Sequence, residues 1–179
     1  CLEDVVAEPV RWLWPGRFAL GKLSLVAGYP GLGKSQLTAA LAAVVTTGGT
    51  WPVTGERYDA PADVLFLSAE DDAADTIKPR LQAAGADLRR CRIIGSVHQA
   101  PDPKNPHKRR CFNLADDLAL LERALVRYPY TRLVVVDPLS AYMGDSRKVD
   151  THRASDVRGI LAPLVELACA RRVAVLGIF

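Results

Sequence analysis

The chain has 179 residues, of which 49% are hydrophobic and 24% charged, and its formal net charge is +3. This composition is typical of a globular protein, and the longest apolar runs are far too short to cross a membrane. The mild positive charge neither requires nor excludes a nucleic-acid partner. We therefore expect a single domain over residues 1–179 with no membrane partner.

The two ends of the chain and its cysteines further limit the class of protein. The chain begins with Cys1 and ends at Phe179 inside an apolar run, so we expect a fragment of a longer polypeptide. Acidic residues from Glu3 to Glu8 argue against a signal peptide. The four cysteines have no C-x-x-C spacing, which indicates neither a metal site nor a disulfide framework. Dispersed thiols fit a reducing cytosol, and we expect a cytoplasmic protein.

The first predicted elements surround a glycine-rich stretch. Residues 1–22 form an apolar lead-in whose tryptophans we expect to pack on the domain, with contact to a neighbouring subunit as the alternative. The apolar run 23–27 predicts a buried parallel strand. Residues 36–45 are rich in Ala and Leu and lack Gly and Pro, so they predict a helix.

Between this strand and this helix lies Gly-Tyr-Pro-Gly-Leu-Gly-Lys-Ser, which fits G-x-x-x-x-G-K-[ST], the phosphate-binding loop of P-loop NTPases. Glycines allow successive backbone N–H groups to point inward around phosphate oxygens, and the following helix N-terminus favours an anion. We expect Lys34 to reach the β- and γ-phosphates and the Ser35 hydroxyl to ligate Mg²⁺. The predicted ATP contacts are Gly28, Pro30, Gly31, Leu32, Gly33, Lys34, Ser35 and Gln36.

The middle of the chain continues the alternation. A loop at 46–63 precedes a buried strand at 64–68, and a helix is predicted over 71–84 with an aspartate cap. Pro79 inside that helix indicates a kink or two short helices. Residues 92–95 predict a third short strand, followed by a polar loop at 98–111.

The last third completes the pattern. Asn113 is a predicted N-cap for a helix over 114–126, with a strand at 132–137 behind it. A helix over 155–170 and a strand over 173–179 follow. Apolar strands that alternate with helices predict an α/β domain whose mainly parallel sheet is covered on both faces.

Two carboxylates at strand ends complete the candidate site. Asp137 ends an apolar strand, which makes it the Walker B candidate that supports Mg²⁺ directly or through water. Many P-loop ATPases place a catalytic Glu next, but here Pro138 follows. Glu70 after the second strand is the candidate water activator. The alternatives are that Glu70 only belongs to an acidic helix start, or that Asp71 or Asp72 takes the role.

Together these pieces resemble the RecA-type ATPases and, more narrowly, the AAA_25 family of bacterial and phage ATPases related to the plasmid helicase RepA and to DnaB-like hexameric helicases. The resemblance rests on residues 28–35, 66–71 and 134–140, with support from 12–17 and 156–158. It implies a RecA-like three-layer α/β/α core in which the strand that carries Glu70 neighbours the Walker B strand. It also implies that Glu70 is the catalytic glutamate.

The resemblance further implies a ring, commonly a hexamer, with ATP at the subunit interfaces, a cationic finger from the neighbour and action on single-stranded DNA. Relatives carry a polar sensor just past the fifth strand, where this sequence ends at Phe179. The first functional hypothesis is therefore a Mg²⁺-dependent ATPase that drives a replicative helicase or a DNA-remodelling ring. The second is a nucleotide-gated assembly or signalling module with little turnover. Loop residues 108–110 and 147–148 are DNA-contact candidates, with solvated surface charge as the simpler interpretation.

Overall fold

A five-stranded parallel sheet forms the centre of the computed structural model, which describes residues 1–95, 97, 98, 109, 110, 112–144 and 154–179, without the side chains of 98, 109 and 154–156. The strand order is β3-β9-β8-β4-β5, and every neighbouring pair is parallel. The strands are β3 (Leu23–Val26), β9 (Ala174–Ile178), β8 (Thr131–Asp137), β4 (Asp63–Ser68) and β5 (Cys91–Ile94).

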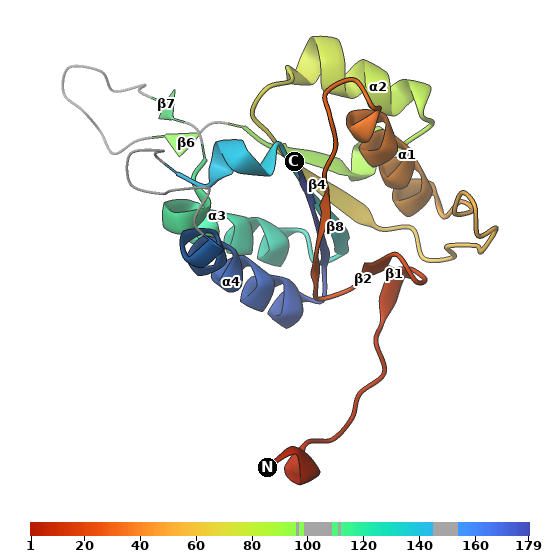
Figure 1. Cartoon of the computed structure of the whole chain (residues 1–179). Coiled ribbons are helices and arrows are strands. Elements are labelled where there is room, and N and C mark those ends of the chain that lie inside the picture. Colours follow the sequence, from red (N-terminus) through yellow and green to blue (C-terminus); the bar gives the residue numbers. More distant parts are fainter. Residues whose placement is uncertain (96, 99–108, 111, 145–153) are drawn as a thin grey trace.

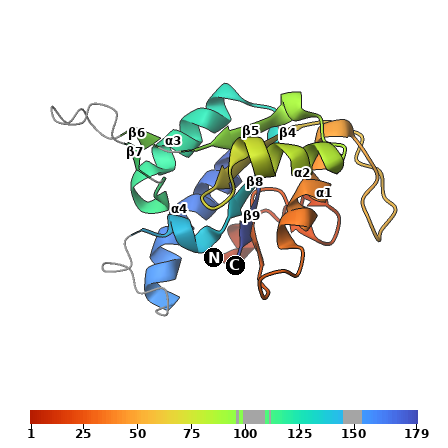
Figure 2. The ribbon, with the colours of Figure 1, turned by 90° about the horizontal axis from the view of Figure 1, so that it is seen from above.

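Helices cover both faces of this sheet (Figures 1 and 2). On one side lie α1 (Lys34–Thr47) and α2 (Lys78–Ala83), and on the other lie α3 (Leu114–Arg127) and α4 (Ala154–Arg171). Successive β8 residues point to opposite faces, so Val135 belongs to the core under α1 while Val134 belongs to the core under α3 and α4. The predicted three-layer α/β/α fold is confirmed.

The helix ends follow from local sequence chemistry. Asn113 caps α3, as predicted, because its side-chain oxygen accepts a hydrogen bond from the N–H of Ala115 at 2.9 Å. The predicted helix over 71–84 is two pieces, the π-helical turn η2 (Ala73–Ile77) and α2. Pro79 lies in the first turn of α2, where its missing N–H leaves no helix bond unmade.

The structure contains several short elements that the sequence did not predict. The lead-in forms a hairpin, β1 (Trp12–Trp14) with β2 (Phe18–Ala19), and the predicted loop at 98–111 is flanked by a second pair, β6 (Val97–His98) with β7 (Arg109–Arg110). The 3₁₀ turns are η1 (Leu2–Asp4), η3 (Leu88–Arg90) and η4 (Leu139–Tyr142).

The lead-in tryptophans differ in their packing. The Trp14 ring is buried and stacks on Trp51 with centroids 5.1 Å apart, as the packing interpretation predicted. Trp12 remains 43% exposed.

Three arginines have buried acidic partners. Arg90 and Arg92 approach the carboxylate of Asp63 at 3.5 and 4.0 Å, and Asp63 is only 8% exposed. Arg110 forms an ion pair with the buried Asp117. The interpretation of Arg110 as solvated charge was therefore wrong, since this residue neutralises a buried carboxylate. The other DNA-contact candidates are outside what the structure describes, residues 108 and 147–148 entirely and Arg109 in its side chain.

Within the part of the chain that the structure describes, no helix is long and apolar enough to cross a bilayer.

Candidate nucleotide-binding site

The carboxyl ends of β3, β8 and β4 meet at one edge of the sheet, and a cleft of about 490 Å³ opens there. The glycine-rich loop, Glu70, Asp137 and Phe179 all line it. Open parallel sheets bind ligands at this edge, and the volume lies within the range of small-molecule sites. The sheet order puts Glu70 and Asp137 close together, because Ser68 pairs directly with Asp137 across β4 and β8.

The glycine-rich loop adopts a conformation that depends on its glycines. Gly31 and Gly33 have φ of +82° and +83°, in the left-handed region that other residues rarely enter. Gly33 is the N-cap of α1, so the helix begins at the loop, and the N–H groups of a first helical turn have no partner within the helix. The Lys34 ammonium crosses the loop and donates hydrogen bonds to the carbonyls of Gly28 and, at 3.1 Å, Tyr29.

Ser35 and Asp137 form the second part of the site. The Ser35 hydroxyl donates a hydrogen bond to Asp137 Oδ2 at 3.2 Å, which joins the first turn of α1 to the end of β8. Burial raises the pKa of Asp137, and the negative charges of Asp71 and Glu70 add to the rise, while the Ser35 hydrogen bond and Arg80 oppose it. Asp137 is therefore a carboxylate that its surroundings leave short of positive charge.

The three acidic residues after β4 have separate roles. Asp72 caps η2 by accepting hydrogen bonds from the N–H groups of Ala74 at 2.7 Å and Asp75 at 3.2 Å. Asp71 is paired with Arg80. Glu70 is exposed on the cleft wall and makes no ion pair or hydrogen bond within the described part of the chain. Of the three competing carboxylates, Glu70 alone has its oxygens uncommitted among the described residues.

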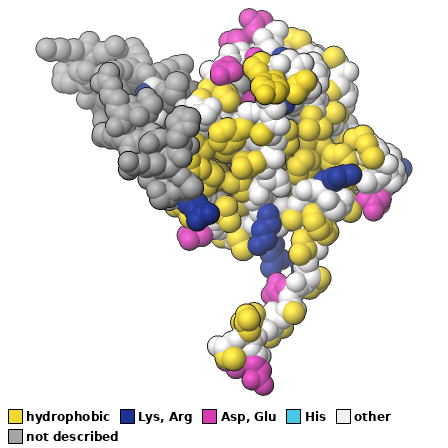
Figure 3. Space-filling model, viewed as in Figure 1, with side chains coloured by type: hydrophobic (Ala, Val, Ile, Leu, Met, Phe, Trp, Pro, Cys, Tyr) yellow, Lys and Arg dark blue, Asp and Glu magenta, His cyan; other side chains and the backbone are white. Residues whose placement is uncertain are grey.

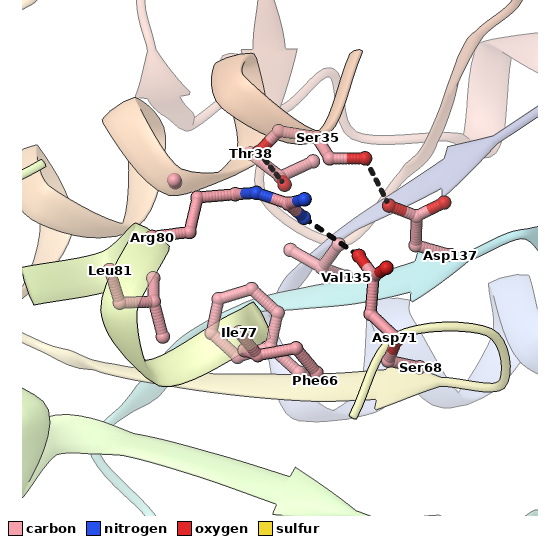
Figure 4. Close-up of a pocket in the computed structure, with 11 residues that line it drawn as sticks. Ser35, Thr38, Phe66, Ser68, Asp71, Ile77, Arg80, Leu81, Val135 and Asp137 are labelled. Carbon is pink, nitrogen blue, oxygen red and sulfur yellow. Dashed lines mark hydrogen bonds and ion pairs between the residues drawn. The ribbon is translucent and has the colours of Figure 1, made fainter. Parts of the chain in front are cut away.

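Arg80 is a site residue that sequence reasoning missed. It extends from α2 toward Asp71 beside Ser35 and Asp137 (Figure 4), and its Nη1 donates to Asp71 Oδ2 at 2.7 Å. Its side chain lines both the main cleft and a small cavity beneath it. Asp71 and Arg80 are nine residues apart, a spacing that matches no recognised motif. The one sequence signal for Arg80 is that it is a basic residue on the helix that follows the Glu-bearing strand.

The family assignment follows from comparison with known proteins. A family model described as AAA domain, AAA_25, matches residues 3–179. The chain belongs to this AAA domain family. No curated protein matches the sequence at a significant level. Membership makes the chain a P-loop nucleotide-binding domain of the ATPase type, with a fold that agrees with the RecA-like expectation.

The AAA domain brings together most of the residues that the sequence nominated. Leu32 is the exception, because it is not among the residues that line the cleft and its side chain is 70% exposed. The Asp137–Pro138 peptide is cis, which the sequence did not indicate. The nominated residues that line the cleft are Gly28, Pro30, Gly31, Gly33, Lys34, Ser35, Gln36, Glu70 and Asp137.

Proposed function

We propose that this AAA domain binds ATP with Mg²⁺ and hydrolyses it, as the motor of a helicase-like or DNA-remodelling ring. The observation that carries the hydrolysis proposal is the division of labour among the three acidic residues after β4. Asp72 caps a helix and Asp71 holds Arg80, which leaves the Glu70 carboxylate open to the cleft that the glycine-rich loop lines.

The loop and Lys34 bind the triphosphate in this proposal. Backbone N–H groups at the start of α1 point toward phosphate oxygens, and the helix dipole favours the negative charge there. The Lys34 ammonium exchanges its present carbonyl partners, Gly28 and Tyr29, for β- and γ-phosphate oxygens. This exchange is favourable because a charge-assisted bond to phosphate is stronger than a bond to a neutral carbonyl.

Ser35 and Asp137 are the residues that fit Mg²⁺. Their oxygens are the ligand type this ion prefers, and the pair lies at the cleft wall with a 3.2 Å separation. Among the described residues no group of three or more His, Cys, Asp or Glu side chains gathers as a metal site. That suits an ion which takes its other ligands from phosphate and water. When bound, the ion would neutralise charge on the β- and γ-phosphates.

Glu70 acts on the water in the proposed reaction. The water oxygen attacks the γ-phosphorus, the bond from that phosphorus to the β–γ bridging oxygen breaks, and ADP and phosphate form. The Glu70 carboxylate accepts a hydrogen bond from the water, orients it and takes its proton as attack proceeds. Arg80, held by Asp71, adds positive charge at the cleft wall opposite the polyphosphate.

The ring, the single-stranded DNA and the neighbour's cationic finger are proposals supported by the resemblance to RecA-type ATPases. The competing function is a nucleotide-gated module that binds ATP but turns it over slowly. Phosphate release by the full-length protein, with and without single-stranded DNA, separates the two. The motor proposal expects DNA-stimulated hydrolysis and unwinding, and absence of both would reject it in favour of the switch.

Matched variants assign the effect to Glu70. Glu70→Gln removes a charge that faces the cleft, whereas Asp72→Asn removes a charge two residues away and keeps the helix cap, since Asn caps as well as Asp. We expect hydrolysis to fall by about 10²–10⁴-fold in the first variant and by less than about twofold in the second. Equal losses would contradict the assignment of Glu70.

A further inference from the structure

The two edges of the central sheet differ in charge. Acidic residues follow β4 and end β8 at the carboxyl edge, beside the nucleotide cleft, whereas basic residues gather at the amino edge, where the strands begin. The small net charge of +3 is therefore distributed unevenly over the domain. The residues that we call the amino-edge cations are Lys22 before β3, Arg171 and Arg172 before β9, Arg127 and Arg132 on either side of the start of β8, and Arg89, Arg90 and Arg92 around the start of β5.

Backbone hydrogen bonds hold the amino-edge cations along one edge of the sheet. The N–H of Val175 donates to the carbonyl of Lys22 at 3.0 Å, and the N–H of Asp63 donates to the carbonyl of Tyr130 at 3.0 Å. Because neighbouring strands lie about 4.8 Å apart, the five strands spread these cations over about 19 Å. On the face shown in Figure 3, the largest patches of Lys and Arg side chains lie in the lower half of the domain, toward the ends at which β3 and β9 begin in Figure 1.

Half of the amino-edge cations have no acidic partner among the described residues. Lys22, Arg127 and Arg172 are exposed and form no salt bridge there. Arg132 is half-buried and donates hydrogen bonds to backbone carbonyls rather than to a carboxylate. These four positive charges are therefore available to an anion from outside the chain. The cations that already have partners are Arg89 with Asp87, Arg90 and Arg92 with Asp63, and Arg171 with Glu122.

The side-chain chemistry of this edge favours phosphate. Seven of the eight amino-edge cations are arginines, whose planar guanidinium matches the geometry of phosphate oxygens. The guanidinium groups of Arg92 and Arg127 lie 4.9 and 5.8 Å from the centre of the Tyr128 ring. That ring is therefore already covered, whereas proteins that bind single strands stack successive bases on free aromatic rings. The edge fits a phosphate backbone better than unpaired bases.

We propose that the amino-edge cations bind the phosphate backbone of double-stranded DNA without reading its sequence. A duplex carries one negative charge per about 1.7 Å of its axis, so a length of about 19 Å presents roughly eleven phosphates to this edge. An acidic protein segment would have to match the same row with carboxylates at a comparable density. The inference goes beyond the proposed motor, because it concerns a duplex held at the edge opposite the nucleotide cleft and requires no hydrolysis.

Two matched single variants test the location of the surface. Arg127→Gln and Lys78→Gln each remove one exposed cation that has no salt bridge within the described chain, but Lys78 lies on α2, away from the amino edge. Fluorescence anisotropy of the full-length protein without nucleotide measures the affinity for a mixed-sequence duplex of about 20 base pairs, at roughly 50 to 200 mM salt. We expect the slope of log affinity against log salt to become shallower by about 1 in Arg127→Gln and to stay unchanged in Lys78→Gln.

A combined variant and a charge-preserving control measure the size of the effect. Replacing Lys22, Arg127 and Arg172 by Gln is expected to weaken duplex binding at least about tenfold and to make the salt slope shallower by about 3. Arg127→Lys with Arg172→Lys keeps the charges and is expected to bind within about twofold of wild type. Because all three positions are exposed, folding is retained, which circular dichroism and thermal melting check.

Competition experiments identify the ligand and separate this proposal from the motor. Neither a single strand of the same length nor polyglutamate at equal charge concentration is expected to displace the duplex. Displacement by either, equal effects of Arg127→Gln and Lys78→Gln, or a folded triple variant with the wild-type salt slope would each overturn the proposal. Phosphate release by the triple variant is expected at the wild-type rate, and the duplex measurement stands whether or not the wild type hydrolyses ATP.

Discussion

Two aspartates that the fold buries fully or in part, one in α3 and one at the end of β8, have opposite electrostatic surroundings. Asp117 in α3 is 5% exposed, accepts hydrogen bonds from both terminal nitrogens of Arg110 and also accepts the N–H of Asn113 at 2.8 Å. These contacts, the Arg110 hydrogen bonds above all, lower its pKa. Asp137 accepts a hydrogen bond from Ser35, and burial raises its pKa.

The contrast separates a structural carboxylate from a functional one. Asp117 is ionised at lower pH when folded than when unfolded, so it stabilises the fold above its unfolded pKa and the contribution is lost as pH falls through the folded pKa. Asp137 has the opposite sign: its ionised form opposes folding above the raised pKa, and the cost disappears at low pH. A buried charge without a sufficient partner is typical of a site that awaits a cation.

Of the two aspartates compared, Asp137 is the one whose replacement by Asn is expected to reduce activity most. We expect hydrolysis to fall by about 10²–10³-fold, because the amide cannot replace a carboxylate beside Mg²⁺. The melting temperature at neutral pH is expected to rise without ligand, since the substitution removes an unfavourable charge. ATPase assays and calorimetry without nucleotide measure both, and a destabilised variant would contradict the assigned sign.

Asp117→Asn tests the other half of the comparison. Breaking the ion pair is expected to cost roughly 2 kcal/mol of the free energy of unfolding, which we discount from larger values for fully buried pairs because the Arg110 side chain is 34% exposed. ATP affinity should change little, since Asp117 does not line the cleft. Urea unfolding and nucleotide titration measure the two quantities. Loss of ATP binding in a folded variant would contradict the assignment of Asp117 as a structural rather than a functional carboxylate.

The pH dependence of stability sharpens the comparison within a single protein. The wild-type free energy of unfolding should fall with acid as Asp117 takes up its proton, and Asp117→Asn should flatten that decline. Asp137→Asn should instead raise stability near neutral pH and make no difference at a pH below the unfolded value of about 4. Urea midpoints across pH 3–8 give the curves, and parallel curves for both variants would contradict it.

Arg80→Ala is expected to reduce activity less than Asp137→Asn does. Removing this cation leaves Asp71 without its partner and takes away a charge that lowers the Asp137 pKa. We expect hydrolysis to fall by about tenfold, with partial recovery in Arg80→Lys, because Lys keeps the charge but not the planar geometry. Steady-state kinetics measure the change, and wild-type kinetics in Arg80→Ala would remove this residue from the site.

The sequence predicted the parts of this site whose chemistry is local. A phosphate loop between a strand and a helix is contiguous, and Asp137 and Glu70 each follow a short apolar run that predicts a buried strand. Nothing in the sequence distinguishes Asp117 from an ordinary acidic residue in a first helical turn, because its ion pair depends on Arg110, which β7 brings to it. The Asp71–Arg80 pair likewise depends on how η2 turns the chain. The two-residue strands β2, β6 and β7 are too short to show a periodic pattern in the sequence.

The most direct test of the account separates binding from chemistry at Glu70. Isothermal titration with ATP and Mg²⁺, paired with phosphate release by the full-length protein, compares wild type, Glu70→Gln and Asp72→Asn. The account predicts that Glu70→Gln binds ATP within about threefold of wild type while its hydrolysis falls by about 10²–10⁴-fold, with Asp72→Asn unchanged. A Glu70→Gln protein that hydrolyses ATP at the wild-type rate would contradict the account.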